Sequence, residues 1–125
     1  MKIRIKGNSV RFRLTKSEVE ELCLAGYIKE TTHFPENTFS YAVKKSSRKE
    51  IHASFEEGII TLHVDADKLN GWDANEEVGF EVLQQIDPET SLHLLLEKDF
   101  VCLDQRLEDQ SDNYPNPKMD TENQL

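Results

Sequence analysis

Charged and apolar residues alternate along the first fourteen positions of the chain. In the segments KIRIK and VRFRL every second residue is basic, and the residues between are Ile, Val, Phe or Leu. This period of two is typical of β-strands with one apolar face and one charged face. Gly7 and Asn8 lie between the segments and suit a two-residue turn, because glycine adopts a positive φ without strain. The pattern therefore predicts an antiparallel hairpin.

This turn determines which residues of the hairpin lie opposite each other. On the apolar face, Ile5 is expected opposite Val10 and Ile3 opposite Phe12. The other face carries the candidate anion-binding residues, with like charges opposite each other: Lys2 with Arg13, and Arg4 with Arg11. Like-charged cross-strand pairs destabilise a sheet by a few tenths to about 1 kcal/mol each. We therefore expect a negative partner over this face.

A helix is predicted over residues 16–25, directly after the hairpin. Thr15 and Glu18 have the spacing of a capping box, and Gly26 is a natural C-terminal cap. Cys23 falls on the apolar face of this helix. It is therefore interpreted as a small core residue rather than a reactive thiol.

The segment from Tyr27 to Leu103 has the pattern of strands joined by turns. IHASFE and IITLHVD are two strands around a tight turn at Glu57-Gly58, and their polar face places His52 opposite His63. The preceding strand, FSYAVKK, is predicted to complete a three-stranded meander through these pairs: Val43 with Ile51, Tyr41 with Ala53, and Phe39 with Phe55.

Two further strands, VGFEVLQQI and SLHLLLEKDF, end this part of the chain. The second is almost continuously apolar and is expected at the centre of a sheet, while Trp72 is expected to fill one end of the core. The predicted fold class is α+β and mainly antiparallel, with one main helix and a twisted, partly closed sheet of about seven strands. Residues 1–103 would form this single domain. Residues 104–125 are an acidic extension, of which residues 106–117 are expected to dock in part.

Charge is distributed unevenly along the chain. The first sixteen residues contain six Lys and Arg and no acid, although the formal net charge of the chain is -9. General nucleic-acid binding is not expected of such an acidic protein, because it needs a dominant positive field.

No apolar run approaches the roughly 20 residues that span a bilayer, and no secretory signal is recognised, so we predict a cytoplasmic protein without membrane contact. Cys23 and Cys102 are expected to stay reduced.

Three kinds of partner could neutralise the basic face of the hairpin. Acids of a neighbouring strand are the first kind, with Glu81 or Glu97 as candidates. The acidic extension is the second, through Glu108, Asp109 and Asp112. The third is an external anion such as a phosphorylated metabolite, which arginine would bind through paired hydrogen bonds.

His52 and His63 are the candidate metal ligands. Their Cβ atoms would be about 5 Å apart across the strand pair, a distance at which two imidazoles can share zinc or copper. His93, Glu97 or Cys102 could add ligands if their strand is adjacent. The alternative is a solvated histidine pair, because no short metal-binding motif accompanies it. Cys102 lies in an apolar stretch and is interpreted as a buried thiol.

No catalytic motif stands out in the chain. It has no nucleophile elbow, Walker-type loop or GxGxxG, so no catalytic residue and no cofactor are predicted. We predict a non-enzymatic binding or interaction module that uses the basic face of the hairpin, with an anionic small molecule or an acidic protein segment as its partner. One alternative is a metal-dependent enzyme that acts on a phosphorylated small molecule. Another is a histidine-based metal-binding protein.

Both ends of the chain carry distinctive segments. They are KIRIKGNSVRFRLTKSEVEEL at the start, and EKDFVCL and EDQSDNYPNP near the end. These segments resemble a family of small bacterial proteins known only as a domain of unknown function. The resemblance implies that Cys102 and the stretch from Glu108 to Pro117 belong to the family pattern, which favours docking of the extension. It implies no activity, cofactor or partner.

Overall fold

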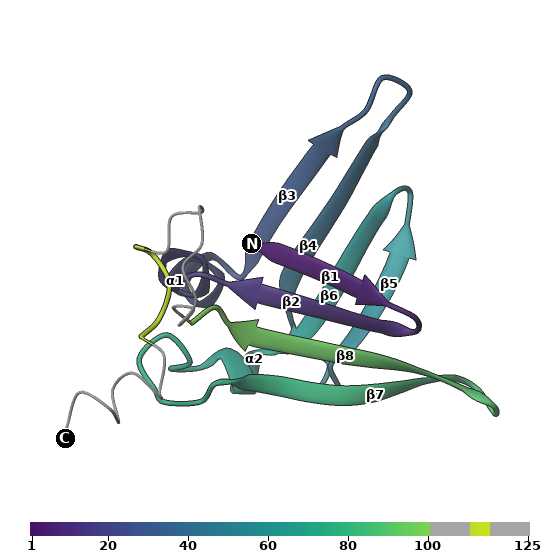
Figure 1. Cartoon of the computed structure of the whole chain (residues 1–125). Coiled ribbons are helices and arrows are strands. Elements are labelled where there is room, and N and C mark those ends of the chain that lie inside the picture. The colour runs from purple at the N-terminus through teal and green to yellow at the C-terminus, as the bar shows by residue number, and fades with distance from the viewer. Residues whose placement is uncertain (101–110, 116–125) are drawn as a thin grey trace.

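The computed structural model describes residues 1–100 and 111–115, which form two four-stranded sheets and two helices (Figure 1). Sheet A has, in spatial order, β1 (Lys2–Lys6), β2 (Ser9–Leu14), β8 (Thr90–Lys98) and β7 (Gly79–Asp87). Sheet B has β3 (Tyr27–His33), β4 (Thr38–Ser46), β6 (Ile59–Asp65) and β5 (His52–Glu56). Helix α1 (Lys16–Ala25) follows β2, and the short helix α2 (Ala66–Leu69) follows β6.

Each sheet has a parallel pair of strands at its centre. β2 pairs with β8 and β4 with β6 in parallel, while the outer pairs of both sheets are antiparallel. A mainly antiparallel fold with a helix is therefore confirmed, but the single, partly closed sheet of about seven strands is wrong. Hydrophobic periodicity indicates which face of a strand is buried, not which strands become neighbours. Parallel neighbours also need long crossover connections, which no turn signal marks.

The first hairpin has the predicted register. Ile3 pairs with Phe12 and Ile5 with Val10 across a turn in which Gly7 has φ 54°. Phe12 is fully buried, whereas Ile5 is 55% exposed. Ile5 was expected in the core, but it lies on the edge strand of sheet A, next to the turn, where little packs against it.

Helix α1 begins and ends where the sequence predicts. The backbone N–H of Thr15 donates to Oε1 of Glu18 at 2.9 Å, as the capping box requires. At the other end Gly26 has φ 79°, and its N–H donates to the carbonyl of Leu22 at 2.9 Å. Leu22 is fully buried and directs the apolar face of α1 at the core.

The second hairpin, β5–β6, is also confirmed, but the meander is wrong. His52 pairs with His63, and the turn residues Glu57 and Gly58 both have positive φ. Strand β4 pairs with β6 rather than β5, so the predicted partners are replaced as follows: Val43 pairs with Leu62 instead of Ile51, Tyr41 pairs with Ile60 instead of Ala53, and Phe39 is not paired with Phe55. Leu62 and Val64 are fully buried, whereas Phe55 is 66% exposed. Strand β6 therefore takes the covered central place and β5 the edge.

The core lies between the two sheets and α1. Its largest fully buried side chain is Trp72, whose Nε1 donates to the carbonyl of Glu77 at 2.9 Å. Strand β8 is central, as its apolar sequence predicts, and contributes Leu94 and Leu96 to this core. Among the described residues, no helix has the length and apolar character needed to cross a membrane.

Candidate functional site

The outer face of sheet A carries a regular array of side chains. Alternate residues of each strand point to this face, and the strand register aligns them in rows across β1, β2, β8 and β7. The rows are Lys6, Ser9, His93 and Leu83; then Arg4, Arg11, Leu95 and Glu81; then Lys2, Arg13, Glu97 and Gly79. We call the cations of this array the basic face: Lys2, Arg4, Lys6, Arg11 and Arg13. Charge thus changes from positive on β1 and β2 to negative on β8 and β7.

Acids of the sheet neutralise part of the basic face. Nε of Arg11 lies 2.9 Å from Oε1 of Glu97, and Nε of Arg13 lies 4.0 Å from the same oxygen. That oxygen is buried and accepts no hydrogen bond from the described residues, so its attraction to the two arginines is one of charge. Nζ of Lys2 lies 3.2 Å from Oδ2 of Asp99. The prediction of a neighbouring acid is therefore correct for Glu97.

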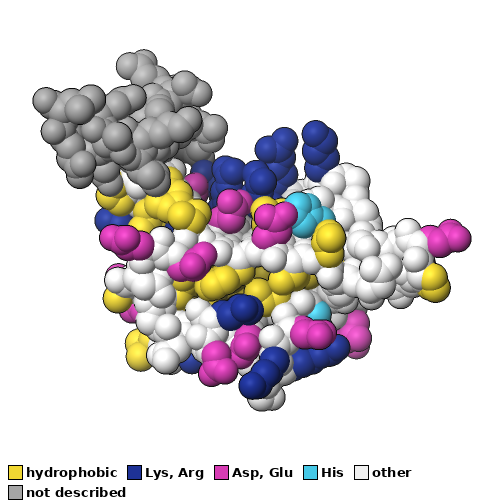
Figure 2. Space-filling model, turned by 90° about the horizontal axis from the view of Figure 1, so that it is seen from below, with side chains coloured by type: hydrophobic (Ala, Val, Ile, Leu, Met, Phe, Trp, Pro, Cys, Tyr) yellow, Lys and Arg dark blue, Asp and Glu magenta, His cyan; other side chains and the backbone are white. Residues whose placement is uncertain are grey.

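Arg4 and Lys6 differ from the other cations of the basic face. Neither has an acidic group within 4.0 Å among the residues described here. A hollow of about 310 Å³ lies beside them, lined by Arg4, Lys6, Ser9, Arg11, His93 and Leu95. A second hollow, of about 280 Å³, is lined by Lys2, Ile3, Arg4, Arg11 and Arg13. Arg4 and Arg11 line both hollows, and no acid lines either. In Figure 2, which shows the molecule from below, Lys and Arg side chains stand together along the upper edge, with acids and a histidine beside them.

His93 and Ser9 were not predicted at this site. Nε2 of His93 lies 2.6 Å from Oε1 of Glu81, and its Nδ1 lies 3.5 Å from Oγ of Ser9. Glu81 therefore pairs with His93, and not with an arginine. The alternation that reveals Lys2 and Arg4 also contains Lys6, so Lys6 could have been found. Ser9 and His93 could not have been found from the sequence, because they become neighbours only through the parallel pairing of β2 with β8.

The two candidate metal ligands lie in sheet B, away from the basic face. The rings of His52 and His63 are stacked, with centroids 4.4 Å apart and planes 4° from parallel. Nε2 of His63 lies 3.1 Å from Oγ of Ser54, and Nδ1 of His52 lies 3.1 Å from the carbonyl of Glu50. Lone pairs lie in the ring planes, so nearly parallel rings direct them along parallel lines rather than toward one ion.

The additional ligands that the sequence suggested do not join this pair. His93 and Glu97 belong to sheet A, so their strand is not adjacent, and Cys102 lies outside the described residues. Within residues 1–100 and 111–115, no three His, Cys, Asp or Glu side chains are grouped to hold a metal. Metal binding at His52 and His63 stays a prediction.

Burial and positive neighbours lower the pKa of His63 below its ordinary 6.5. The neighbours that lower it are His52, Lys44 and Arg48, while Glu56 acts in the opposite direction. The unfolded chain therefore binds a proton at a pH where folded His63 does not.

We expect the free energy of unfolding to fall as the pH drops below about 6.5, and to fall less steeply in His63→Gln. Denaturant midpoints between pH 5 and 8 measure this slope. His33→Gln, at an exposed position of β3, is the control, and a slope that His63→Gln leaves unchanged would refute the prediction.

Residues 111–115 contact the domain beside α1 and the end of β8. The carboxylate of Asp112 accepts from the hydroxyl of Ser17 at 2.6 Å, and this bond lowers the pKa of Asp112. The N–H of Tyr114 donates to the carbonyl of Asp99 at 2.7 Å. Asp112 therefore binds the start of α1 rather than the arginines.

The rest of the segment that was expected to dock, residues 106–110 and 116–117, lies outside the described residues. It includes Glu108 and Asp109, the other acids expected over the basic face. The extent of docking and the boundary at 104 remain predictions.

Charged and aromatic side chains lie around the ring of Tyr114. The centre of its ring lies 5.7 Å from the centre of the Phe100 ring. Nζ of Lys98 lies 5.1 Å from the centre of the Tyr114 ring and 5.6 Å from that of the Trp72 ring. Burial raises the pKa of Tyr114 to about 12 and lowers that of Lys98. The sequence segments EKDFVCL and EDQSDNYPNP are thus connected in space through Lys98, Phe100 and Tyr114.

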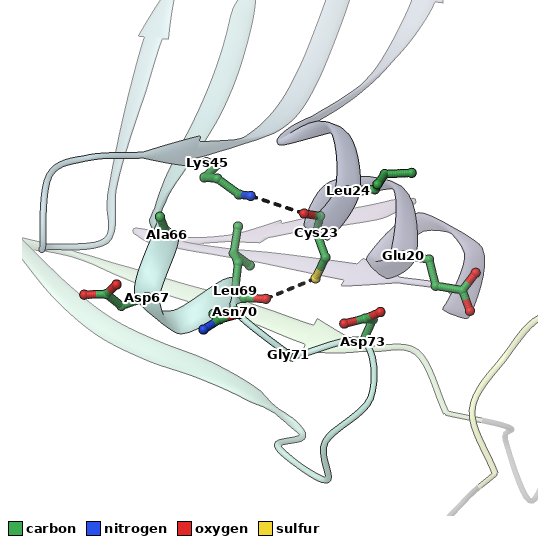
Figure 3. Close-up of a pocket in the computed structure, with 10 residues that line it drawn as sticks. All are labelled: Glu20, Cys23, Leu24, Lys45, Ala66, Asp67, Leu69, Asn70, Gly71 and Asp73. Atoms are coloured by element: carbon green, nitrogen blue, oxygen red, sulfur yellow. Dashed lines mark hydrogen bonds between the residues drawn. The ribbon is translucent and has the colours of Figure 1, made fainter.

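A third hollow, of about 470 Å³, lies between α1 and α2 (Figure 3). The Cys23 thiol donates to the carbonyl of Leu69 at 3.2 Å, and Nζ of Lys45 donates to the carbonyl of Cys23 at 3.2 Å. Burial raises the pKa of the thiol, which favours the unreactive protonated form. The charged residues of the lining are three acids, Glu20, Asp67 and Asp73, and one lysine, Lys45, so this hollow does not suit an anion.

Comparison with known proteins gives a single result for the whole chain. A family model matches residues 1–118, and its description is a family of unknown function (DUF7009). The search of the curated proteins finds no significant match. The search of the solved structures finds none either.

Proposed function

Because the chain belongs to a family of unknown function (DUF7009), we propose its role from the site itself: it is an anion-binding module, and the basic face of sheet A is its binding surface. The observation that carries this proposal is the hollow of about 310 Å³, which is lined by three cations and no acid. In a chain of net charge -9, such a local excess of positive charge is unexpected without a negative partner.

The register of the sheet gives an energetic reason for a partner. Arg4 lies opposite Arg11 and Lys2 opposite Arg13, and each like-charged pair disfavours the sheet by a few tenths to about 1 kcal/mol. Glu97 relieves this repulsion at Arg11 and Arg13. Arg4 and Lys6 have no such acid among the described residues, so an external anion is the partner we expect there.

The donors around the hollow suit a phosphate group. Arginine presents a planar fork of N–H donors that matches two phosphate oxygens, and lysine adds a point charge. The hydroxyl of Ser9 and the ring of His93 lie on the adjoining side. A volume of about 310 Å³ is at the small end of ligand pockets. We therefore propose a small phosphorylated molecule, or an acidic side chain of a partner, as the natural ligand.

The arrangement of acids favours association over catalysis. A metal-dependent phosphoester enzyme needs carboxylates grouped beside the arginines. The two acids of the array are instead separate, with Glu97 beside Arg11 and Glu81 beside His93. The proposal is therefore a binding role.

Thermal unfolding with pyrophosphate as the probe tests this role. A ligand that binds only the folded state raises Tm, so we expect Tm of the full chain to rise with pyrophosphate at constant ionic strength. Arg4→Gln removes one charge-assisted contact and should weaken binding about tenfold or more. Arg4 is exposed and has no acidic partner within residues 1–100 and 111–115, so this variant should fold normally.

Lys29→Gln is the matched control, because it removes one exposed cation from β3 in the other sheet. Its response to pyrophosphate should equal that of the native protein. An equal response in Arg4→Gln and Lys29→Gln would contradict the proposal, since binding would then reflect overall charge and not this face.

A further inference from the structure

A larger hollow, of about 630 Å³, lies where an edge of sheet B approaches an edge of sheet A. The two edge strands, β5 and β7, are not paired through their backbones. A single side chain connects them: Gln84 accepts from the N–H of Ala53 at 2.6 Å and donates to its carbonyl at 3.2 Å. The residues around the hollow come from β7, from α2, from the loop that precedes β5, and from His52 at the start of β5.

The charges around this hollow are mostly positive. Arg48, Lys49 and Lys68 line it, and Glu50 is the one acid that does so. None of the three cations has an acidic group within 4.0 Å in the described parts of the chain. All three side chains are exposed, so their charged ends can reach a ligand in the hollow.

Apolar residues form another part of the lining. Ile51 is almost fully buried and Val82 is partly buried. Leu83 also borders the hollow, but it follows Val82 in β7, so its side chain points to the outer face of sheet A. Figure 2 views this side of the molecule and shows a band of apolar side chains with basic side chains next to it. The hollow therefore combines an apolar wall with a cationic rim.

We propose that this hollow is a second binding site, and that it takes a small organic anion with an apolar body. The carboxylate, sulfonate or phosphate of such a ligand would lie against Arg48 and Lys68, and its apolar part would lie against Ile51 and Val82. The volume of about 630 Å³ lies in the middle of the range for small-molecule sites. The positive field extends into sheet B, where Lys44 and Arg48 add to the effect of burial and of His52 in lowering the pKa of His63. A bound anion would offset that field.

Fluorescence titration with 8-anilinonaphthalene-1-sulfonate tests the proposal, because this probe joins a sulfonate to an apolar ring system. The double variant Arg48→Gln/Lys68→Gln should bind it at least tenfold more weakly than the native chain. Lys16→Gln/Lys29→Gln removes the same charge from exposed positions of α1 and β3 that line neither site, and it should bind the probe within twofold of the native chain. The uncharged analogue N-phenyl-1-naphthylamine should bind all three proteins equally.

Histidine titration by NMR locates the bound probe. An anion in this hollow should raise the pKa of His63, which lies beside His52 at the border of the hollow. Far-UV circular dichroism checks that each variant is folded. A loss of probe binding that is equal in both double variants, an absence of saturable binding to the native chain, or a His63 pKa that the probe leaves unchanged would overturn the proposal.

Discussion

Replacement of Trp72 by alanine is expected to lower the free energy of unfolding by about 3–5 kcal/mol, the range for truncating a large buried aromatic side chain. Trp72 is fully buried, and its ring lies 5.2 Å from that of Phe80. Nζ of Lys98 also packs over the indole ring. The alanine variant would leave a cavity and an unpartnered Glu77 carbonyl.

Trp72→Phe is the matched comparison for this prediction. It keeps most of the apolar volume but loses the bond from Nε1 to Glu77, so it should be destabilised by about 1–2 kcal/mol. Urea unfolding should be followed by far-UV circular dichroism, because Trp72 is the only tryptophan of the chain. Equal stabilities of the alanine and phenylalanine variants would show that the indole does not fill the core as described.

The second large effect is expected at Gly79, which begins β7 opposite Glu97. A Cβ atom there would lie 2.2 Å from the carbonyl oxygen of Leu96 and 2.9 Å from Cα of Glu97. Both are backbone atoms of the central strand, so they cannot move without disturbing the sheet. Gly79→Ala should therefore lower the free energy of unfolding by about 3 kcal/mol, the upper part of the usual range for overpacking.

Val78→Ala is the control for Gly79, since Val78 is the preceding residue and is 45% exposed. It should cost less than about 1 kcal/mol. Denaturant unfolding of both variants measures the difference. A Gly79→Ala protein as stable as Val78→Ala would mean that β7 does not approach β8 as closely as the structure has it.

Local features of this fold could be predicted from the sequence. The period of two in KIRIK and VRFRL, with Gly7 between them, determined the register of the first hairpin. The cap residues Thr15 and Gly26 gave the limits of α1. The pairing of His52 with His63 followed from one tight turn. In each case, the interacting residues belong to one hairpin or to one end of a helix.

The non-local features could not be predicted in the same way. Strand β2 pairs with β8 although most of the chain lies between them, and β4 pairs with β6 across the whole of β5. No alternation of residues specifies such a neighbour. For this reason the sequence gives no sign that Ser9 and His93 border the same hollow as Arg4.

The charged partners illustrate the same limit. Glu81 and Glu97 were both candidate acids of a neighbouring strand, and only Glu97 lies beside an arginine. Asp112 was assigned to the basic face by charge alone, but it binds Ser17 at the start of α1 instead. A hydroxyl and backbone N–H groups at a helix start compete well for a carboxylate, and charge patterns do not reveal them.

The central claim is that anions bind the basic face of sheet A beside Arg4. Two-dimensional amide NMR of the ¹⁵N-labelled full chain during titration with pyrophosphate tests it most directly. The account predicts saturable shifts in β1, in β2 and at His93, with the signals of β5 and β6 unchanged and the response lost in Arg4→Gln. Shifts confined to Arg48, Lys68 and their neighbours, or no saturable shift on sheet A, would contradict the claim.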